Sequence, residues 1–120
     1  MNDRKNVTRE KSFAFALRVV KLWKLLGDER REWVLSKQLL RSGTAVGALV
    51  REAEHAESKA DFIHKMAIAQ KEANESAYWL ELLHQSSYLS DKEFDSIMQD
   101  QLEISKILAS IILTCKGVKK

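Results

Sequence analysis

Two Glu-x-x-His motifs are the groups in this sequence that are best suited to chemistry, Glu52–His55 and Glu81–His84. Four-helix bundles that hold two iron ions use this spacing on two of their helices, because the two side chains then face the same metal pair. To share one metal pair, both motifs would have to lie at the same level of the bundle. If the chain turns near Glu57, a helix that runs on to the second motif separates the two by roughly 40 Å, at a rise of about 1.5 Å per residue. The sequence therefore predicts no di-iron site, and we expect no metal and no other cofactor.

The remaining candidate groups do not form a catalytic set. His64 has no cluster of histidines and carboxylates around it, and the three histidines share no spacing typical of metal ligands. The single cysteine, Cys115, cannot form an internal disulfide and ends an apolar segment, where a thiol packs as a small hydrophobic group. No serine or cysteine is paired with a base at a spacing typical of nucleophilic catalysis. We therefore predict that the chain is not an enzyme.

Two glycines four residues apart, Gly43 and Gly47, lie in the stretch RSGTAVGALV. A phosphate-binding P-loop has four intervening residues, a following lysine and a preceding strand, none of which is found here. Both glycines instead continue the helical phase of the apolar residues before them, although each costs about 1 kcal/mol relative to alanine inside a helix. We therefore predict a seam of small residues that allows close packing against large side chains. The large side chains expected opposite this seam are Trp23, Trp33 and Trp79.

Length and composition favour one helical domain. One hundred and twenty residues suit a single hydrophobic core, and the sequence has no proline and only four glycines. It contains no uncharged apolar run of about 18 residues, which a transmembrane helix requires. Its polar first residues also lack the apolar core of a signal peptide. We therefore expect a cytoplasmic protein without membrane contact.

Apolar side chains recur at three- and four-residue steps in four segments, which is the period of a helix with one buried face. Connections of a few residues make each helix antiparallel to the next one. The predicted fold class is all-α, an antiparallel up-down-up-down four-helix bundle. It forms a single domain over 1–120, with basic flexible ends at about 1–10 and 117–120. The predicted helices cover about 11–26, 29–56, 59–85 and 91–115.

The ends of these helices are predicted from residues that satisfy free backbone groups. Gly27 indicates the end of the first helix, and Asp28 indicates the N-cap of the second. Ser58 and Ser90 indicate the N-caps of the third and fourth helices, each with acidic residues in the following turn. Gly117 indicates a glycine stop after the last helix. The first helix is expected to bury Phe13, Ala16, Leu17, Val20, Trp23 and Leu26.

Charge is distributed unevenly along the chain. Residues 1–28 carry a net charge of +4, whereas residues 88–115 carry −3. This asymmetry indicates either a basic face for an anionic partner or complementary surfaces between subunits. Phosphate contacts need only cations at suitable spacing, and a rival hypothesis is a scaffold that binds a protein partner through the acidic third and fourth helices. The nucleic-acid-binding residues that we predict are Arg18, Lys21, Lys24, Arg30, Arg31 and Lys37.

A polar run with Lys71, Glu72 and Glu75 interrupts the apolar pattern of the third helix. One interpretation is a solvated face with an i, i+4 ion pair between the lysine and Glu75. The other is a polar network that faces the second helix, where the antiparallel register makes Arg41 a better partner than Arg51. Beyond this run, the third and fourth helices carry more apolar residues than one seam can bury. This surplus predicts a homo-oligomer, in which another copy covers the remaining surface.

The segments LSKQLLRSGTAVGALVREAEHA (35–56) and DFIHKMAIAQKEANESAYWLELL (61–83) resemble a family of small bacterial proteins. These proteins are encoded within intervening sequences of large-subunit (23S) ribosomal RNA genes, and the resemblance covers about residues 12–114. It implies an antiparallel four-helix bundle, often a homopentamer, without known catalytic activity. The family is similar to a basic, barrel-shaped pentamer of retroelements that binds nucleic acid, so RNA or DNA binding is the implied role.

The family pattern is carried by a motif in the second helix and another in the third. Two positions depart from it, because serine is common where this chain has Ala45, and asparagine where it has Leu49. Polar contacts from that face are therefore not carried over. The structural motif comprises Arg41, Ser42, Gly43, Thr44, Gly47 and Glu52 in the second helix, and Lys71, Glu72, Glu75 and Trp79 in the third.

Overall fold

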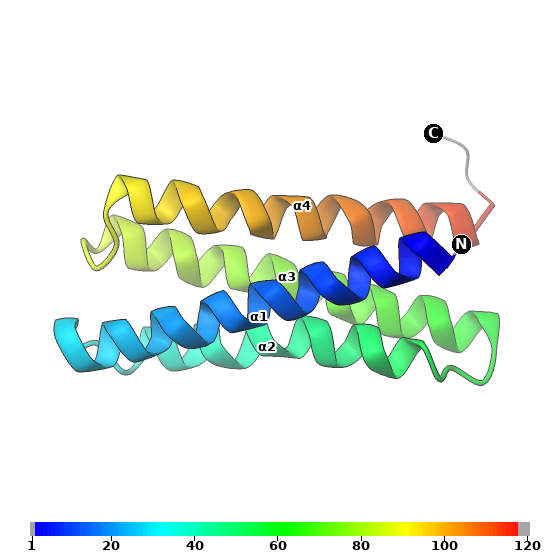
Figure 1. The fold of residues 1–120 in the computed structure, drawn as a ribbon, viewed down its shortest axis with the longest axis horizontal. Coiled ribbons are helices and arrows are strands. Elements are labelled where there is room, and N and C mark those ends of the chain that lie inside the picture. The colour runs from blue at the N-terminus through cyan, green and yellow to red at the C-terminus, as the bar shows by residue number, and fades with distance from the viewer. Residues whose placement is uncertain (1, 118–120) are drawn as a thin grey trace.

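The computed structural model describes residues 2–117, and the side chains of residues 6–117. Each of its four helices packs antiparallel to the next, and α1 also contacts α4, so the chain forms an up-down-up-down bundle with extents of 45 × 26 × 20 Å (Figure 1). The predicted fold class is confirmed. The helices are α1 (Asn2–Arg30), α2 (Leu35–Ala53), α3 (Lys59–Gln85) and α4 (Asp91–Cys115).

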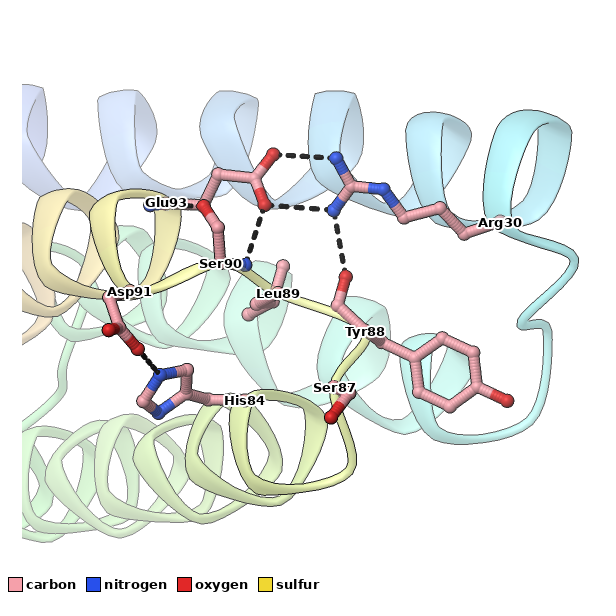
Figure 2. A pocket seen from close by; sticks show the side chains of 8 residues that line it. All are labelled: Arg30, His84, Ser87, Tyr88, Leu89, Ser90, Asp91 and Glu93. Carbon is pink, nitrogen blue, oxygen red and sulfur yellow. Dashed lines mark hydrogen bonds and ion pairs between the residues drawn. The ribbon is translucent and has the colours of Figure 1, made fainter.

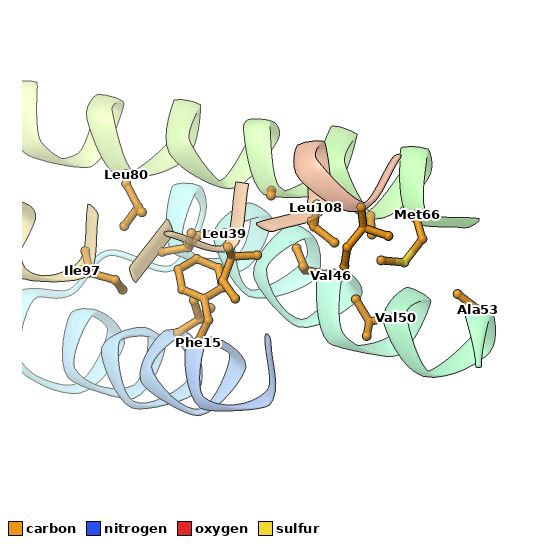
Figure 3. Close-up of a cluster of buried hydrophobic side chains, with 14 of the residues drawn as sticks. Phe15, Leu39, Val46, Val50, Ala53, Met66, Leu80, Ile97 and Leu108 are labelled. Atoms are coloured by element: carbon orange, nitrogen blue, oxygen red, sulfur yellow. The ribbon is translucent and has the colours of Figure 1, made fainter. Parts of the chain in front are cut away.

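A single hydrophobic core runs along the bundle between the four helices (Figure 3). In α2, α3 and α4, its residues follow the apolar periodicity of the sequence, so these three predicted faces are largely confirmed. Full burial of a Val, Leu, Ile, Phe or Met side chain in this core stabilises the fold by about 1.5–3 kcal/mol. The largest apolar side chains that are fully buried are Phe15, Leu26, Leu39, Leu80, Leu83, Ile104 and Leu108.

The buried face of α1 differs from the prediction. Phe13 and Leu17 were expected in the core, but they are 49% and 48% exposed. The true face lies beside them and includes two polar residues, which an apolar pattern does not reveal. Its buried side chains are Thr8, Ser12, Phe15, Val19 and Leu26. The face of α1 that the sequence predicted to be buried is therefore wrong, because the helix is rotated about its axis relative to that prediction.

The first helix is also longer than predicted. Residues 2–10, expected to form a flexible basic end, are helical, and Gly27 and Asp28 lie inside α1 rather than between two helices. The helix ends at Arg30, and the next residue, Arg31, has a φ of 58°, which is in the left-handed region. In the other predicted flexible end, residues 118–120 lie outside the described residues.

Glu32, rather than the predicted Asp28, caps the start of α2. Its carboxylate accepts hydrogen bonds from three backbone amides, those of Val34, Leu35 and Ser36, at 3.1, 2.9 and 2.7 Å. The hydroxyl of Ser36 donates to the Glu32 carbonyl oxygen at 2.9 Å. Glu32 is only 6% exposed, so the loop between α1 and α2 is organised around a buried carboxylate.

The predicted ends of α3 and α4 are confirmed, whereas α2 covers Leu35–Ala53 rather than about 29–56. Ser58 caps α3 by accepting a hydrogen bond from the Asp61 amide at 3.0 Å. Ser90 and Glu93 form a reciprocal capping box at the start of α4. Gly117 follows α4 with a φ of 77°, which favours glycine. These ends are set by local contacts, which explains why the sequence reveals them.

The small-residue seam of α2 faces α1, but its neighbours are not tryptophans. A Cβ atom on Gly43 would lie 2.8 Å from a methyl group of Val19, and one on Gly47 would lie 3.4 Å from the backbone oxygen of Ser12. The indole of Trp33 instead covers Gly27, within α1. The predicted seam is therefore present, whereas the predicted tryptophan partners were wrong, because a valine and the α1 backbone make the close approach.

Candidate nucleic-acid interface

Arg41 joins α2 to α3 through two carboxylates. Its guanidinium lies 3.3 Å from Glu72 Oε1 and forms a direct ion pair with Glu75. Trp79 Nε1 donates to Glu75 Oε2 at 3.0 Å. Arg51, the alternative partner, instead lies 5.1 Å from the centre of the Phe13 ring. Of the two interpretations of the polar run, the structure therefore shows the network that faces α2, with Arg41 rather than Arg51 as the partner.

The same contacts shift the pKa values of this network. Hydrogen bonds from the Trp79 indole and then from Arg41 lower the pKa of the Glu75 carboxyl. Hydrogen bonds to Glu75 and then to Glu72 raise the pKa of the Arg41 guanidinium. Lys71, the competing candidate, forms no ion pair within the described part of the chain. Arg41 and Glu75 are therefore partnered within the chain, whereas Glu72 Oε1 is buried without a hydrogen bond among the described residues.

The other motif residues also hold helices in place. Ser42 and Ser76 are buried opposite each other, with 3.0 Å between their hydroxyl oxygens. Thr44 donates its hydroxyl proton to the Leu40 carbonyl oxygen at 2.7 Å. Glu52 pairs with Lys65 of α3 at 3.1 Å. Together with Gly43 and Gly47, these residues fix how α2 packs, which makes the motif structural.

We predict that Arg41 and Glu75 are energetically coupled. The substitutions Arg41→Met and Glu75→Gln, made singly and together, are expected to give a coupling of about 0.5–1 kcal/mol, because this ion pair is partly exposed. Urea denaturation of the four proteins measures this value. A second cycle that pairs Arg41→Met with Glu81→Gln is the control, since Glu81 is exposed and is not one of the ion-pair partners of the arginine. Equal coupling in the two cycles would contradict the network.

Two of the six predicted nucleic-acid-binding residues are used within the chain. Arg18 of α1 donates to Asp100 of α4 at 2.8 Å and to the Ser96 hydroxyl at 2.9 Å. Arg30 binds both carboxylate oxygens of Glu93 at 2.9 and 2.7 Å, and it also donates to a backbone carbonyl of the loop before α4 (Figure 2). These two arginines fasten α1 to α4 and are already partnered.

The other four predicted cations, Lys21, Lys24, Arg31 and Lys37, are exposed. None of them forms an ion pair with any residue whose side chain the structure describes. Lys21 and Lys24 lie on the second half of α1, Arg31 follows its last residue, and Lys37 lies in the first turn of α2. The structure therefore brings these cations to the same end of the bundle, where they remain available to an anionic ligand.

The Arg30–Glu93 pair makes stability sensitive to acid. Hydrogen bonds from Arg30 and from the Ser90 backbone lower the pKa of the Glu93 carboxyl from 4.5 to about 2. A depressed pKa means that this stabilisation is complete above pH 4.5 and is lost as the pH falls from 4.5 towards about 2. We expect Glu93→Gln to flatten the decline in unfolding free energy across this window, measured by urea denaturation. Parallel curves for the wild type and the variant would contradict this, and Glu57→Gln is the exposed control.

A groove of about 470 Å³ lies between α1 and α4. Arg18, Lys21, Leu22 and Leu25 line it from α1, and Lys92, Glu93, Ser96 and Ile97 line it from α4. Lys92 is exposed and, like Lys21, forms no ion pair with a described side chain. Sequence reasoning missed Lys92, because it stands among the carboxylates that begin α4. Only the packing of the first helix beside the last one reveals its position.

A second pocket, of about 490 Å³, lies at the loop between α3 and α4 (Figure 2). Its charged groups and its imidazole are paired, since Arg30 binds Glu93, His84 Nε2 lies 2.6 Å from Asp91, and the imidazole stacks on Phe94. His84 belongs to the second Glu-x-x-His motif, whereas the first motif, Glu52–His55, lies at the opposite end of the bundle, where α2 ends and the α2–α3 loop begins.

Among residues 6–117, no group of three or more His, Cys, Asp or Glu side chains is placed to hold a metal ion. None of the helices between residues 2 and 117 combines the length and apolar character of a membrane span.

Comparison with known proteins points to one family. Residues 4–110 match the family described as 23S rRNA-intervening sequence protein. A crystal structure of a protein of unknown function from the S23 ribosomal protein family of Bacteroides thetaiotaomicron VPI-5482 is 54% identical. The match covers 91% of this chain and 97% of that chain, with a TM-score of 0.90. No curated protein matches the sequence.

Proposed function

We propose that this chain, which belongs to the 23S rRNA-intervening sequence protein family, is a non-enzymatic protein that binds structured RNA through a basic surface. The observation that carries the proposal is the set of four exposed cations that lack ion pairs among the described side chains, Lys21, Lys24, Arg31 and Lys37. Such cations bind phosphates without reading sequence, so binding is electrostatic and weakly sequence-specific. Both family names also refer to the ribosome or its RNA.

A scaffold that binds a protein partner through α3 and α4 is the alternative function. Its acidic surface is largely used inside the chain, because many carboxylates of these helices already have a basic partner. This pairing leaves less unneutralised charge for a protein ligand, which favours the RNA hypothesis. The paired carboxylates are Glu72, Glu75, Glu93, Asp100 and Glu103.

We also propose that the protein is a homo-oligomer, for which the family resemblance implies five copies. Phe13 and Leu17, about half exposed on one stripe of α1, supply apolar surface that a second copy can cover. Further exposed apolar side chains lie on α3 and α4, at Tyr78, Leu102 and Leu113. A closed ring would present the same basic surface several times to one RNA, which strengthens individually weak contacts.

Removal of the four cations tests this function. Affinity for RNA falls as salt rises, and each phosphate contact makes the slope of log affinity against log salt steeper by about 0.7–0.9. We expect the combined variant Lys21→Gln, Lys24→Gln, Arg31→Gln and Lys37→Gln to reduce the steepness of this slope by about 3. Filter binding or fluorescence anisotropy with a structured RNA, between low and physiological salt, measures the slope.

A matched control removes the same charge from other surfaces. Its substitutions are Lys59→Gln, Lys71→Gln, Lys106→Gln and Lys116→Gln. It is expected to retain most of the salt dependence of the wild-type protein. Two results would contradict the proposal: wild-type affinity that does not change with salt, or equal losses in the two variants.

A further inference from the structure

We propose that the groove between α1 and α4 binds one unpaired nucleotide of a single-stranded RNA segment. Its phosphate lies between Lys21 and Lys92, and its base lies against Leu22, Leu25 and Ile97. This inference rests on the proposed RNA binding and deepens it, because it selects which part of the RNA is held and adds a residue from α4. The basic surface of α1 alone would accept any phosphate backbone.

Two sets of contacts hold the groove in shape. On one side, Arg18 of α1 binds Asp100 and Ser96 of α4. On the other side, Arg30 binds both carboxylate oxygens of Glu93. Arg18, Glu93 and Ser96 belong to these attachments and also line the groove. Lys21, Leu22, Leu25 and Ile97 lie between the attachments, and Lys92 directly precedes Glu93. The walls are therefore fixed without a ligand, as is usual for a small-molecule site.

The free charge of the groove is positive. Of its four charged residues, Arg18 and Glu93 are neutralised by Asp100 and by Arg30. Lys21 and Lys92 are exposed and lack an ion pair within the part of the chain whose side chains are described. Both line the same groove, Lys21 from α1 and Lys92 from α4, so the proposed phosphodiester lies between them. The charges of the two lysines thus complement a nucleotide rather than a neutral or cationic ligand.

The floor of the groove is apolar. Leu22 and Leu25 are partly buried, and Ile97 is almost fully buried. The volume of about 470 Å³ lies in the range of small-ligand sites, about 300–1,000 Å³. An unpaired base offers a flat face to such a floor, whereas the bases of a duplex are stacked on one another and are not available. The groove therefore favours a loop, bulge or single strand over a double helix.

Reversal of one charge on α4 tests the groove without changing α1. Lys92→Glu is the test and Lys106→Glu is the control, because both lysines are exposed on α4 and unpaired among the described side chains, and only Lys92 lines the groove. The probe is an RNA hairpin with 2-aminopurine in its loop, and a second hairpin carries it in the stem. With the wild-type protein, the emission of the loop probe alone is expected to change on binding. Lys92→Glu is expected to lower affinity for the hairpin about tenfold or more, because it replaces a cation that contacts the phosphate with a carboxylate that repels it. Lys106→Glu is expected to lower affinity much less.

The outcomes separate this inference from the proposed function. If the wild-type protein binds the hairpin but the two variants lose affinity equally, the groove is not the site, although RNA binding stands. A blunt duplex that binds as tightly as the hairpin overturns the inference in the same way. Adenosine monophosphate is the third arm, and if it binds as tightly as the hairpin, the ligand is a free nucleotide rather than a strand. Absence of any hairpin binding at low salt overturns both proposals.

Discussion

Replacing Gly43 by alanine is expected to lower the free energy of unfolding by about 1–3 kcal/mol, the usual cost of inserting a methyl group into a packed interface. The new Cβ atom would lie 2.8 and 2.9 Å from the two methyl groups of Val19. That valine is fully buried, and a β-branched side chain in a helix has one strongly preferred rotamer, so it cannot move aside. The helices α1 and α2 would have to separate.

Gly47→Ala provides the matched comparison one turn along the same helix. Its Cβ atom would lie 3.4 Å from the Ser12 backbone oxygen, at the edge of ordinary contact. Alanine also removes the entropic cost of glycine in a helix, about 0.5–1 kcal/mol. We therefore expect Gly47→Ala to leave stability unchanged or to increase it. Urea denaturation of both variants tests the pair, and an equal loss in the two would show that the seam does not distinguish these positions.

Loss of the Glu32 carboxylate is expected to cost about 2 kcal/mol, the upper end of the range for an N-cap. This carboxylate accepts three backbone hydrogen bonds at the start of α2, and Glu32→Ala would leave all three amides without that partner. The group is also almost fully buried, so water replaces it poorly. Glu32→Gln retains one acceptor oxygen, so its free energy of unfolding is expected to lie between those of the wild-type protein and Glu32→Ala.

Asp28→Ala is the control for this prediction. The sequence pattern marks Asp28 as the N-cap, but it is exposed and lies in the last turn of α1. Its removal is expected to change the unfolding free energy by less than about 0.5 kcal/mol, as for most surface substitutions. Thermal or urea unfolding of both alanine variants decides between the two residues. A larger loss for Asp28→Ala than for Glu32→Ala would contradict the observed cap.

The fold could be predicted where local chemistry determines it. The apolar periods of α2, α3 and α4 and the caps at Ser58 and Ser90 depend on residues within a few turns of one another. The orientation of α1 was predicted wrongly, because Thr8 and Ser12 lie on its buried face while Phe13 and Leu17 lie outside. Its C-terminal end was also wrong, because Gly27 is used for close contact with an indole rather than as a helix stop.

The candidate site could be predicted only in part. The contact of Arg41 with Glu72 and Glu75 follows from the register of two consecutive helices, which the short α2–α3 loop fixes. The partners of Arg18 and Arg30 could not be predicted, because they lie on α4, at the far end of the sequence. How the first helix packs beside the last depends on the whole core rather than on any local pattern.

The most direct test of the central claim is the mass of the full chain in solution, with and without a structured RNA, measured by light scattering at low and at high salt. We expect several copies of the 13.8 kDa chain to associate in the absence of RNA. We also expect a heavier complex with RNA at low salt, which dissociates to the protein oligomer at high salt. A mass of one chain that RNA does not change at any salt concentration would contradict this claim.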